Sequence, residues 1–234
     1  MNKITLSLCL IPGYVAVSCI LNYWIFPEPF ADSSDLPRSG TTLVNEGIRS
    51  KFVYRQTSIE TAGQLFEWDN FVDPSGGPSE IPHVHPHMRE VFRVVDGELR
   101  FTIDGREQIA KAGDTVVAEA GAVHAFQNVS GKPAHMISRF EPAEDGPWER
   151  LAEEGLLPDS TFVQIDRAGG LGRVSPIQML VLGTRHKQGY PPGLSTQAWD
   201  AIEFLIAPTA RLFGIHVYYP PRGSPRQGDC PTSR

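Results

Sequence analysis

Three histidines and a glutamate stand close together in GGPSEIPHVHPHMREVFRVVDG, residues 76–97. His83 and His85 lie two residues apart, and alternate side chains of a strand point to the same face, so an extended chain brings both imidazoles to one side. Glu90 begins the apolar run that follows, from which its carboxylate can return to the same point. Two imidazoles and a carboxylate around one centre suit iron, manganese, nickel, copper or zinc. The spacing therefore predicts a metal site.

A fourth ligand is expected from a neighbouring strand. His124 directly follows a glycine turn in AEAGAVHAFQN and is the candidate. The third histidine of the cluster, His87, comes after Pro86, which bends the chain. We therefore interpret His87 as a residue at the rim of the site rather than a proton shuttle. The remaining histidines show no partner pattern and are assigned no role: His135, His186 and His216.

The spacing of these residues resembles the two sequence motifs of the cupin superfamily. The pattern G-x5-H-x-H-x4-E-x6-G from Gly77 to Gly97 agrees with the first motif at every fixed position. The pattern G-x5-E-x-G-x2-H-x3-N from Gly113 to Asn128 agrees with the second, except that Glu119 stands where the family usually has proline. The resemblance covers about residues 51–142, under half of the chain.

The resemblance implies a double-stranded β-helix, or jelly-roll barrel, with one divalent metal ion in its mouth. Carried over residue by residue, it implies four metal ligands: His83, His85, Glu90 and His124. The departure at Glu119 affects a turn and leaves all four in place, and we expect Glu119 to be exposed and Asn128 to support a turn. A barrel that has lost its metal is the alternative.

Short runs with strand character supply the elements that must position these ligands. Turns containing glycine separate the runs, and Asp96-Gly97 and Asp104-Gly105 are hairpin signals. Many short, evenly spaced strands are typical of a sandwich or small barrel. The sequence predicts an all-β core over residues 51–142, with strands in 51–57, 64–72, 90–97, 98–105, 106–113, 114–121, 124–130 and 134–142.

After Pro142 the pattern becomes helical. Amphipathic stretches predict helices within 144–159, 175–190 and 196–221, and Pro208 interrupts the last. Residues 143–221 are thus expected to form a C-terminal helical extension, followed by a disordered tail over 222–234. The extension caps the barrel, forms a dimer interface or rests against a bilayer; the sequence leaves these alternatives open.

The N-terminus carries 23 residues without a charge, Ile4 to Phe26, behind Lys3. This length can cross a hydrocarbon core of about 30 Å, and Tyr23 and Trp24 suit a membrane interface. We predict a membrane anchor over residues 1–26, a linker over 27–50, and a cupin domain outside the cytoplasm. A cleaved signal peptide, which gives a secreted protein, and a segment buried by packing are the alternatives.

Charge and cysteine content exclude some partners. The formal net charge of −6 and the lack of a lysine or arginine block argue against binding to nucleic acid. Three cysteines, two of them in the apolar N-terminus, do not make a disulfide framework. The expected partners are a small molecule, a membrane through the N-terminal segment and, by the resemblance, a second copy of the chain.

The implied ligand set leaves open positions on a metal that prefers five or six ligands, where water, dioxygen or a chelating substrate can bind. The leading hypothesis is a dioxygenase, similar to the quercetinase-type cupins, that acts on a small hydrophobic enolic or phenolic substrate. Glu90 is then the candidate catalytic residue, as ligand and proton acceptor. The alternatives are a non-redox isomerase or lyase and a non-enzymatic protein that binds a ligand or metal at the cell surface.

Other side chains near the ligands are assigned by strand position. Arg93 and Arg139 are expected to point outward into solvent rather than to meet an anionic substrate. Phe92, Phe101 and Phe126 share parity with the ligands or lie on neighbouring strands, and they form either the apolar wall of the pocket or plain core.

Overall fold

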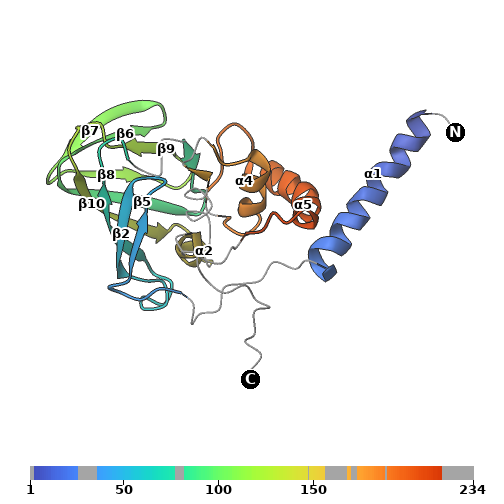
Figure 1. The fold of residues 1–234 in the computed structure, drawn as a ribbon, viewed down its shortest axis with the longest axis horizontal. Coiled ribbons are helices and arrows are strands. Elements are labelled where there is room, and N and C mark those ends of the chain that lie inside the picture. Colours follow the sequence, from blue (N-terminus) through green and yellow to red (C-terminus); the bar gives the residue numbers. More distant parts are fainter. Residues whose placement is uncertain are drawn as a thin grey trace, which may run out of the picture.

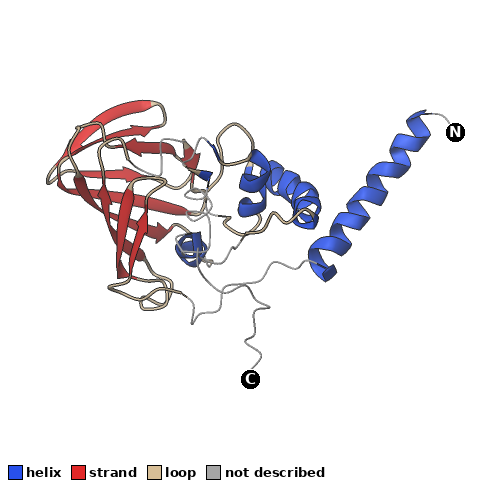
Figure 2. Ribbon diagram, viewed as in Figure 1, coloured by secondary structure: helices blue, strands red, loops and turns tan. Residues whose placement is uncertain are grey.

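The computed structural model describes residues 3–25, 36–76, 82–146, 148–155, 168–169, 173–187 and 189–217. A two-sheet β sandwich holds the middle of the chain, and the two helices within residues 176–212 lie between it and a long N-terminal helix (Figure 1). Strands and helices are segregated, so nearly all of the helical residues lie to one side of the sandwich (Figure 2). The predicted mainly β core with a C-terminal helical extension is confirmed.

The sandwich consists of one six-stranded and one four-stranded antiparallel sheet. The larger sheet has the order β1-β2-β3-β10-β5-β8 and the smaller one the order β4-β9-β6-β7. The larger sheet contains β1 (Thr42–Asn45), β2 (Ser50–Gln56), β3 (Phe66–Val72), β10 (Ala134–Pro142), β5 (Met88–Asp96) and β8 (Thr115–Ala118). The smaller sheet contains β4 (His83–Val84), β9 (Val123–Gln127), β6 (Glu98–Ile103) and β7 (Arg106–Lys111).

All eight strand segments read from the sequence contain a strand. The extended stretch expected at His83 and His85 forms the two-residue β4. One further strand was not expected: β1, which lies within the predicted linker over 27–50 and pairs with β2. The predicted tail over 222–234 lies outside the described residues, as does Gly77 of the first motif.

The alternation of side chains along the strands builds the core between the sheets. In β5, Met88, Glu90, Phe92 and Val94 are buried while Arg89 and Arg93 are exposed, as expected for a strand with one face against a core. One apolar cluster centres on Phe92, Leu99, Phe101, Phe126 and Met136. A second cluster fills the other end of the sandwich with Phe52, Tyr54, Phe66, Trp68, Met88 and Phe140.

The two turns predicted from Asp96-Gly97 and Asp104-Gly105 need the backbone freedom of glycine. Asp104 and Gly105 both have positive φ, 48° and 76°, which matches a two-residue hairpin loop of the type that favours Asp-Gly. Gly97 has φ 84°, and a Cβ there would stand 2.9 Å from Cα of Ala134. Glycine therefore lets the β5–β6 connection pass close to the start of β10.

Three helices make up the described part of the C-terminal extension: α2 (Trp148–Gly155), α4 (Pro176–Gly183) and α5 (Thr196–Leu212). The hydroxyls of Ser175 and Ser195 cap the N-termini of α4 and α5 by accepting backbone N–H groups. Helix α5 continues through Pro208, which sits inside it. Helices α4 and α5 pack around a small apolar cluster, which contains Val181, Leu182, Ala207, Ala210 and Val217.

The apolar N-terminus forms α1 (Lys3–Ile20), continued by one π-helical turn, Leu21–Ile25. The Tyr14 hydroxyl donates a hydrogen bond to the carbonyl of Leu205 at 2.6 Å, and the Asn22 amide donates to the carbonyl of Phe204 at 3.0 Å. These contacts pack the segment against α5. Within the parts of the chain that the structure describes, no helix is long and apolar enough to cross a membrane. The predicted N-terminal helix is thus present, but its transmembrane character is not supported.

Candidate metal centre

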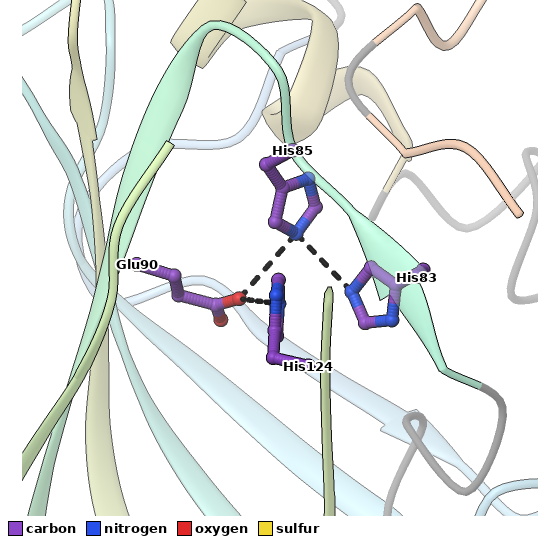
Figure 3. A group of neighbouring side chains, drawn as sticks. All are labelled: His83, His85, Glu90 and His124. Atoms are coloured by element: carbon purple, nitrogen blue, oxygen red, sulfur yellow. Dashed lines mark hydrogen bonds and ion pairs between the residues drawn. The ribbon is translucent and has the colours of Figure 1, made fainter. Parts of the chain in front are cut away.

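Four side chains converge between the two sheets, three of them on strands and one directly after a strand (Figure 3). We call this group the donor cluster: His83, His85, Glu90 and His124. One donor atom from each residue lies within 4.8 Å of all the others. His83 and His124 come from the four-stranded sheet, His85 follows β4 directly, and Glu90 comes from the six-stranded sheet. The structure thus brings together all four residues that the sequence predicted as ligands.

Backbone pairing fixes the histidines relative to one another. His83 and His124 are directly opposite in the antiparallel pair β4–β9. Beyond the end of β4, the N–H of Gly121 donates to the carbonyl of His85 at 2.9 Å. This bond holds the second histidine against the turn that leads into β9. The two histidines of the first motif are therefore positioned by the second motif, His83 by its strand β9 and His85 by its glycine turn.

The distances within the donor cluster suit a single ion. Nε2 of His83 and Nε2 of His85 are 3.2 Å apart. Oε2 of Glu90 lies 3.4 Å from Nε2 of His85 and 3.2 Å from Nε2 of His124. Nitrogen and oxygen ligands of one ion, each at about 2.0–2.2 Å, lie roughly 3.0–3.5 Å from one another. The observed donor set therefore fits a metal ion.

A hydrogen bond orients the His124 ring. Its Nδ1 lies 3.0 Å from the carbonyl oxygen of Ala122, which can only accept, so Nδ1–H is the donor. In the neutral ring this tautomer leaves the lone pair on Nε2, directed at the centre of the cluster. Such support from an outer hydrogen bond is typical of histidines that bind metals.

The cluster is largely removed from solvent, and this controls its charge. His85 and Glu90 are each 6% exposed and His124 is 2% exposed. Burial alone would raise the pKa of Glu90, but hydrogen bonds and charge from His124 and His85 outweigh it and lower the pKa to about 2. Burial by itself would lower the pKa of His124. The hydrogen bond between His124 and Glu90 outweighs burial, so the pKa of His124 is raised. Glu90 is therefore an anionic oxygen donor at neutral pH.

Aromatic rings surround the donor cluster. The Phe140 ring meets the His85 ring edge-on, with centroids 5.0 Å apart, and Phe92 lies 6.3 Å from the His124 ring. Phe101 and Phe126 pack against Phe92 in the core rather than against the ligands. The sequence interpretation missed Phe140. Its signal was available, because Phe140 occupies an inward position of β10 directly opposite Glu90 on β5.

The structure also shows the positions of four polar residues that the sequence analysis placed outside the site. Arg139 points away from the cluster and donates hydrogen bonds to Glu67 and Glu141, and Arg93 is exposed. Glu119 is exposed, as expected. The Asn128 amide donates to the carbonyls of Val72 and Lys132, and its side-chain oxygen accepts the N–H of Ser130, so it supports a turn.

His87, the third histidine of the opening segment, lies outside the donor cluster. Its ring stacks on Trp148 with centroids 3.7 Å apart, and its Nδ1 pairs with Glu144. His87 is 28% exposed in its side chain, which agrees with a position at the rim. It ties the turn after His85 to helix α2.

Comparison with known proteins agrees with the geometry. Residues 71–140, which include the whole donor cluster, match the Cupin_2 family, described as "Cupin domain". The chain is 29% identical over 129 residues to "Oxalate oxidase 1" of Hordeum vulgare, covering 51% of this chain and 63% of that protein. It is 30% identical over 89 residues to "Probable germin-like protein subfamily 2 member 5" of Arabidopsis thaliana, covering 36% and 42%.

Solved structures resemble the chain over a similar region. A structure of oxalate oxidase is 26% identical and covers 51% of this chain and 63% of its own, with a TM-score of 0.37. The structure of KdgF from Halomonas sp. is 19% identical and covers 45% and 88%, with a TM-score of 0.38. This chain spans less than two thirds of the length of the curated relatives given above. The matched region and the donor cluster within it show that residues 71–140 of this chain form a cupin domain, which is similar in sequence to the germins and oxalate oxidases.

Proposed function

We propose that this protein is a metal-dependent oxidoreductase of the dioxygenase type that acts on a small enolic or phenolic substrate. The observation that carries the proposal is the donor cluster, in which three imidazoles and one carboxylate converge within 4.8 Å. The residues that hold the ion are His83, His85, Glu90 and His124. When bound, a redox-active ion supplies Lewis acidity and electron transfer.

The protein side chains around the cluster prepare the site for such a substrate. The anionic Glu90 offsets part of the charge of a divalent ion, and its low pKa favours the role of ligand over that of a strong base. The hydrogen bond from His124 Nδ1 to Ala122 keeps the ring in the tautomer that a ligand requires. Phe140 and Phe92 exclude water beside two of the ligands and favour a substrate with an apolar or aromatic body.

A second candidate substrate class comes from the relatives. The similarity to oxalate oxidases favours a small dicarboxylic acid, which also chelates a metal through two ionised oxygens. The two candidates share the metal centre and differ in the body of the substrate and in the product. A non-redox isomerase or lyase and a protein that binds without catalysis remain the competing classes.

Oxygen uptake tests the proposal. The full chain, loaded separately with iron, manganese, nickel, copper or zinc, is given catechol, a flavonol, a 1,3-diketone or oxalate, and dioxygen and hydrogen peroxide are followed together. Uptake of dioxygen with an enolic or phenolic compound and without peroxide supports the dioxygenase. Uptake with oxalate that yields peroxide supports the second candidate instead.

The matched control makes the same substitution at a histidine outside the donor cluster. His124→Gln removes a ligand, whereas His135→Gln changes a histidine that pairs with Asp69 outside the donor cluster. We expect activity to disappear in His124→Gln and to persist in His135→Gln. Substrate conversion that proceeds without dioxygen, or a metal-loaded protein that converts nothing, contradicts the proposal.

We also propose that the cupin domain works outside the cytoplasm, attached to a membrane through its N-terminal segment. The support is the uncharged stretch from Ile4 to Phe26 and the exposure of Tyr23 and Trp24, at 71% and 85%. Fractionation of cells that express the full chain checks this. Recovery of the protein in the soluble cytoplasmic fraction contradicts it.

A further inference from the structure

A segment of the C-terminal extension pairs with the strand that carries two of the metal ligands. The N–H of Val84 donates to the carbonyl of Tyr190 at 2.9 Å, and the N–H of Tyr190 donates to the carbonyl of Val84 at 3.0 Å. Strand β4 is the edge of the four-stranded sheet, with β9 on its other side. Tyr190 therefore occupies the free edge of β4. Val84 stands between His83 and His85, so this bridge fixes the backbone that carries both imidazoles.

The same segment also passes close to the ligand His85. A Cβ built on Gly189 would stand 3.9 Å from Cε1 of His85, which is ordinary van der Waals contact. The backbone at Gly189 thus passes directly beside the imidazole ring. Gly189 is exposed, and a side chain longer than Cβ at this position lies next to His85.

Side chains anchor this segment to helix α5. Tyr190 is 5% exposed, and its hydroxyl donates to Asp200 at 3.1 Å. The indole N–H of Trp199 donates to the carbonyl of Pro191 at 2.9 Å. Lys187 donates to Asp200 and to Glu203, each at 2.6 Å. A buried tyrosine with a bonded hydroxyl and a paired lysine are rigid anchors, so the position of the segment is set by α5.

We propose that residues 189–191 form a strap by which the C-terminal helices hold β4 and position His83 and His85 for metal binding. Tyr190 is then a positioning residue, which acts through the backbone of Val84. Without the strap, this segment keeps the pairing of β4 with β9 and the bond from Gly121 to His85, so the two histidines lose one of three backbone supports. This inference rests on the metal centre proposed above and assigns the C-terminal extension its role there.

The main test variant is Tyr190→Pro, because proline has no N–H to donate to Val84. The matched control is Leu194→Pro, the same replacement at an exposed residue in the turn that follows. A second variant, Gly189→Leu, leaves the bridge intact and places a side chain against His85. Gly189→Leu tests the strap proposal if Tyr190→Pro does not fold.

Two measurements separate positioning from general stability. The affinity of the full chain for Co(II) is measured by competition with a chelator, and the Tm of the metal-free protein is measured in parallel. Loss of an outer support of a metal ligand typically lowers metal affinity about 10–100-fold. We expect a loss of this size in both Tyr190→Pro and Gly189→Leu. Tyr190→Pro also removes a buried side chain and therefore lowers the metal-free Tm, whereas Gly189→Leu, at an exposed position, should keep a metal-free Tm no lower than that of Leu194→Pro. Pulsed EPR of the Cu(II)-loaded variants should show fewer bound imidazoles than in the wild type.

The outcomes distinguish the two proposals. Wild-type Co(II) affinity in both strap variants overturns the strap, as does an equal loss of affinity in Leu194→Pro. If the strap variants lose Co(II) affinity as expected but the wild-type protein oxidises no substrate, the proposed function is overturned and the strap proposal is supported. A wild-type chain that binds no Co(II) overturns both.

Discussion

The donor cluster and the outer face of the six-stranded sheet both place histidine beside carboxylates, and they use that pairing differently. On the outer face, Arg55 and Arg139 both bind Glu67, while Arg55 and His135 both bind Asp69. We call this set, with Arg89 and Glu141, the outer charge network. There each carboxylate has two partners, drawn from arginine and histidine side chains. In the donor cluster one carboxylate serves two imidazoles, and the donor atoms converge on a point.

The difference teaches that convergence of donor atoms, rather than the presence of histidine and glutamate, marks the metal centre. Strand β10 separates the two regions within four residues, because its side chains alternate between the faces of the sheet. Ser138 and Phe140 point into the sandwich, while Arg139 and Glu141 belong to the outer charge network. Neighbouring substitutions on this strand can therefore break one region and spare the other.

The largest effect is expected from Phe140→Ala. Phe140 packs on Trp68, Phe66 and His85, and removal of a buried phenylalanine side chain costs about 3–5 kcal/mol of unfolding free energy. The adjacent Arg139→Ala should cost about 1 kcal/mol or less, since its ion pairs are partly exposed. Urea unfolding checks both. Equal costs at the two positions would contradict the assignment of the two faces.

The next effect is on metal affinity. Glu90→Gln keeps the size of the side chain but removes the anionic donor, so the affinity for a divalent ion should fall by about 100-fold or more. Glu67→Gln is the matched control in the outer charge network and should leave the affinity unchanged. Isothermal titration with Mn(II) and Co(II) provides the measurement. A similar loss in both variants would mean that the protein responds to its net charge rather than to the donor cluster.

The carboxylate of Glu153 differs from those of both regions, because it is buried and its charged neighbours are acidic. Burial raises the pKa of Glu153 to about 7, helped by the charges of Glu60 and Glu149 and opposed by hydrogen bonds from Ser58. It also packs near Tyr54, whose pKa is raised by burial and by Glu153. The folded chain thus holds a proton on Glu153 at pH values where the unfolded chain has lost it.

The sign of the pH dependence follows. Between about pH 4.5 and pH 7 the folded state binds more protons, so this group's contribution makes stability fall as pH rises through that window, by about 3 kcal/mol in total. Glu153→Gln should remove the slope and be more stable than the wild type at pH 8. Denaturant unfolding at several pH values tests this, and an unchanged slope in the variant would refute it.

The smallest effect is expected in the outer charge network. Asp69→Asn weakens the pairs with Arg55 and His135, and half-exposed pairs of this kind contribute about 0.5–1 kcal/mol. The loss should shrink in 1 M salt because the charges are then screened. Thermal unfolding at low and high salt provides the comparison. A larger loss that salt does not reduce would indicate a buried structural role.

The sequence predicted the eight main strands and the membership of the donor cluster because both are encoded locally. Alternation of apolar and polar side chains marks strands such as β5, and the Asp104-Gly105 turn needs positive φ at both positions. The ligands fall within two short motifs, so His83, His85 and Glu90 could be read together. The second motif supplied His124 in the same way, and the pairing of β4 with β9 places it opposite His83.

The strap could not be predicted because it joins residues far apart in the sequence. Val84 and Tyr190 meet through a single backbone bridge, and nothing in the local pattern at either residue indicates the other. The N-terminal segment illustrates the same limit. Its apolar run predicts that the segment is buried, but does not indicate whether in a membrane or against protein. In the structure, Tyr14 and Asn22 bind backbone carbonyls of α5.

The metal content of the full chain tests the central claim most directly. Wild type, His85→Ala and His135→Ala are purified without chelator or added metal, and each is analysed by elemental mass spectrometry. The convergent donor cluster predicts stoichiometric metal in the wild type and in His135→Ala, and none in His85→Ala. Metal that persists in His85→Ala, or a wild-type protein that holds none and takes up none on reconstitution, would contradict it.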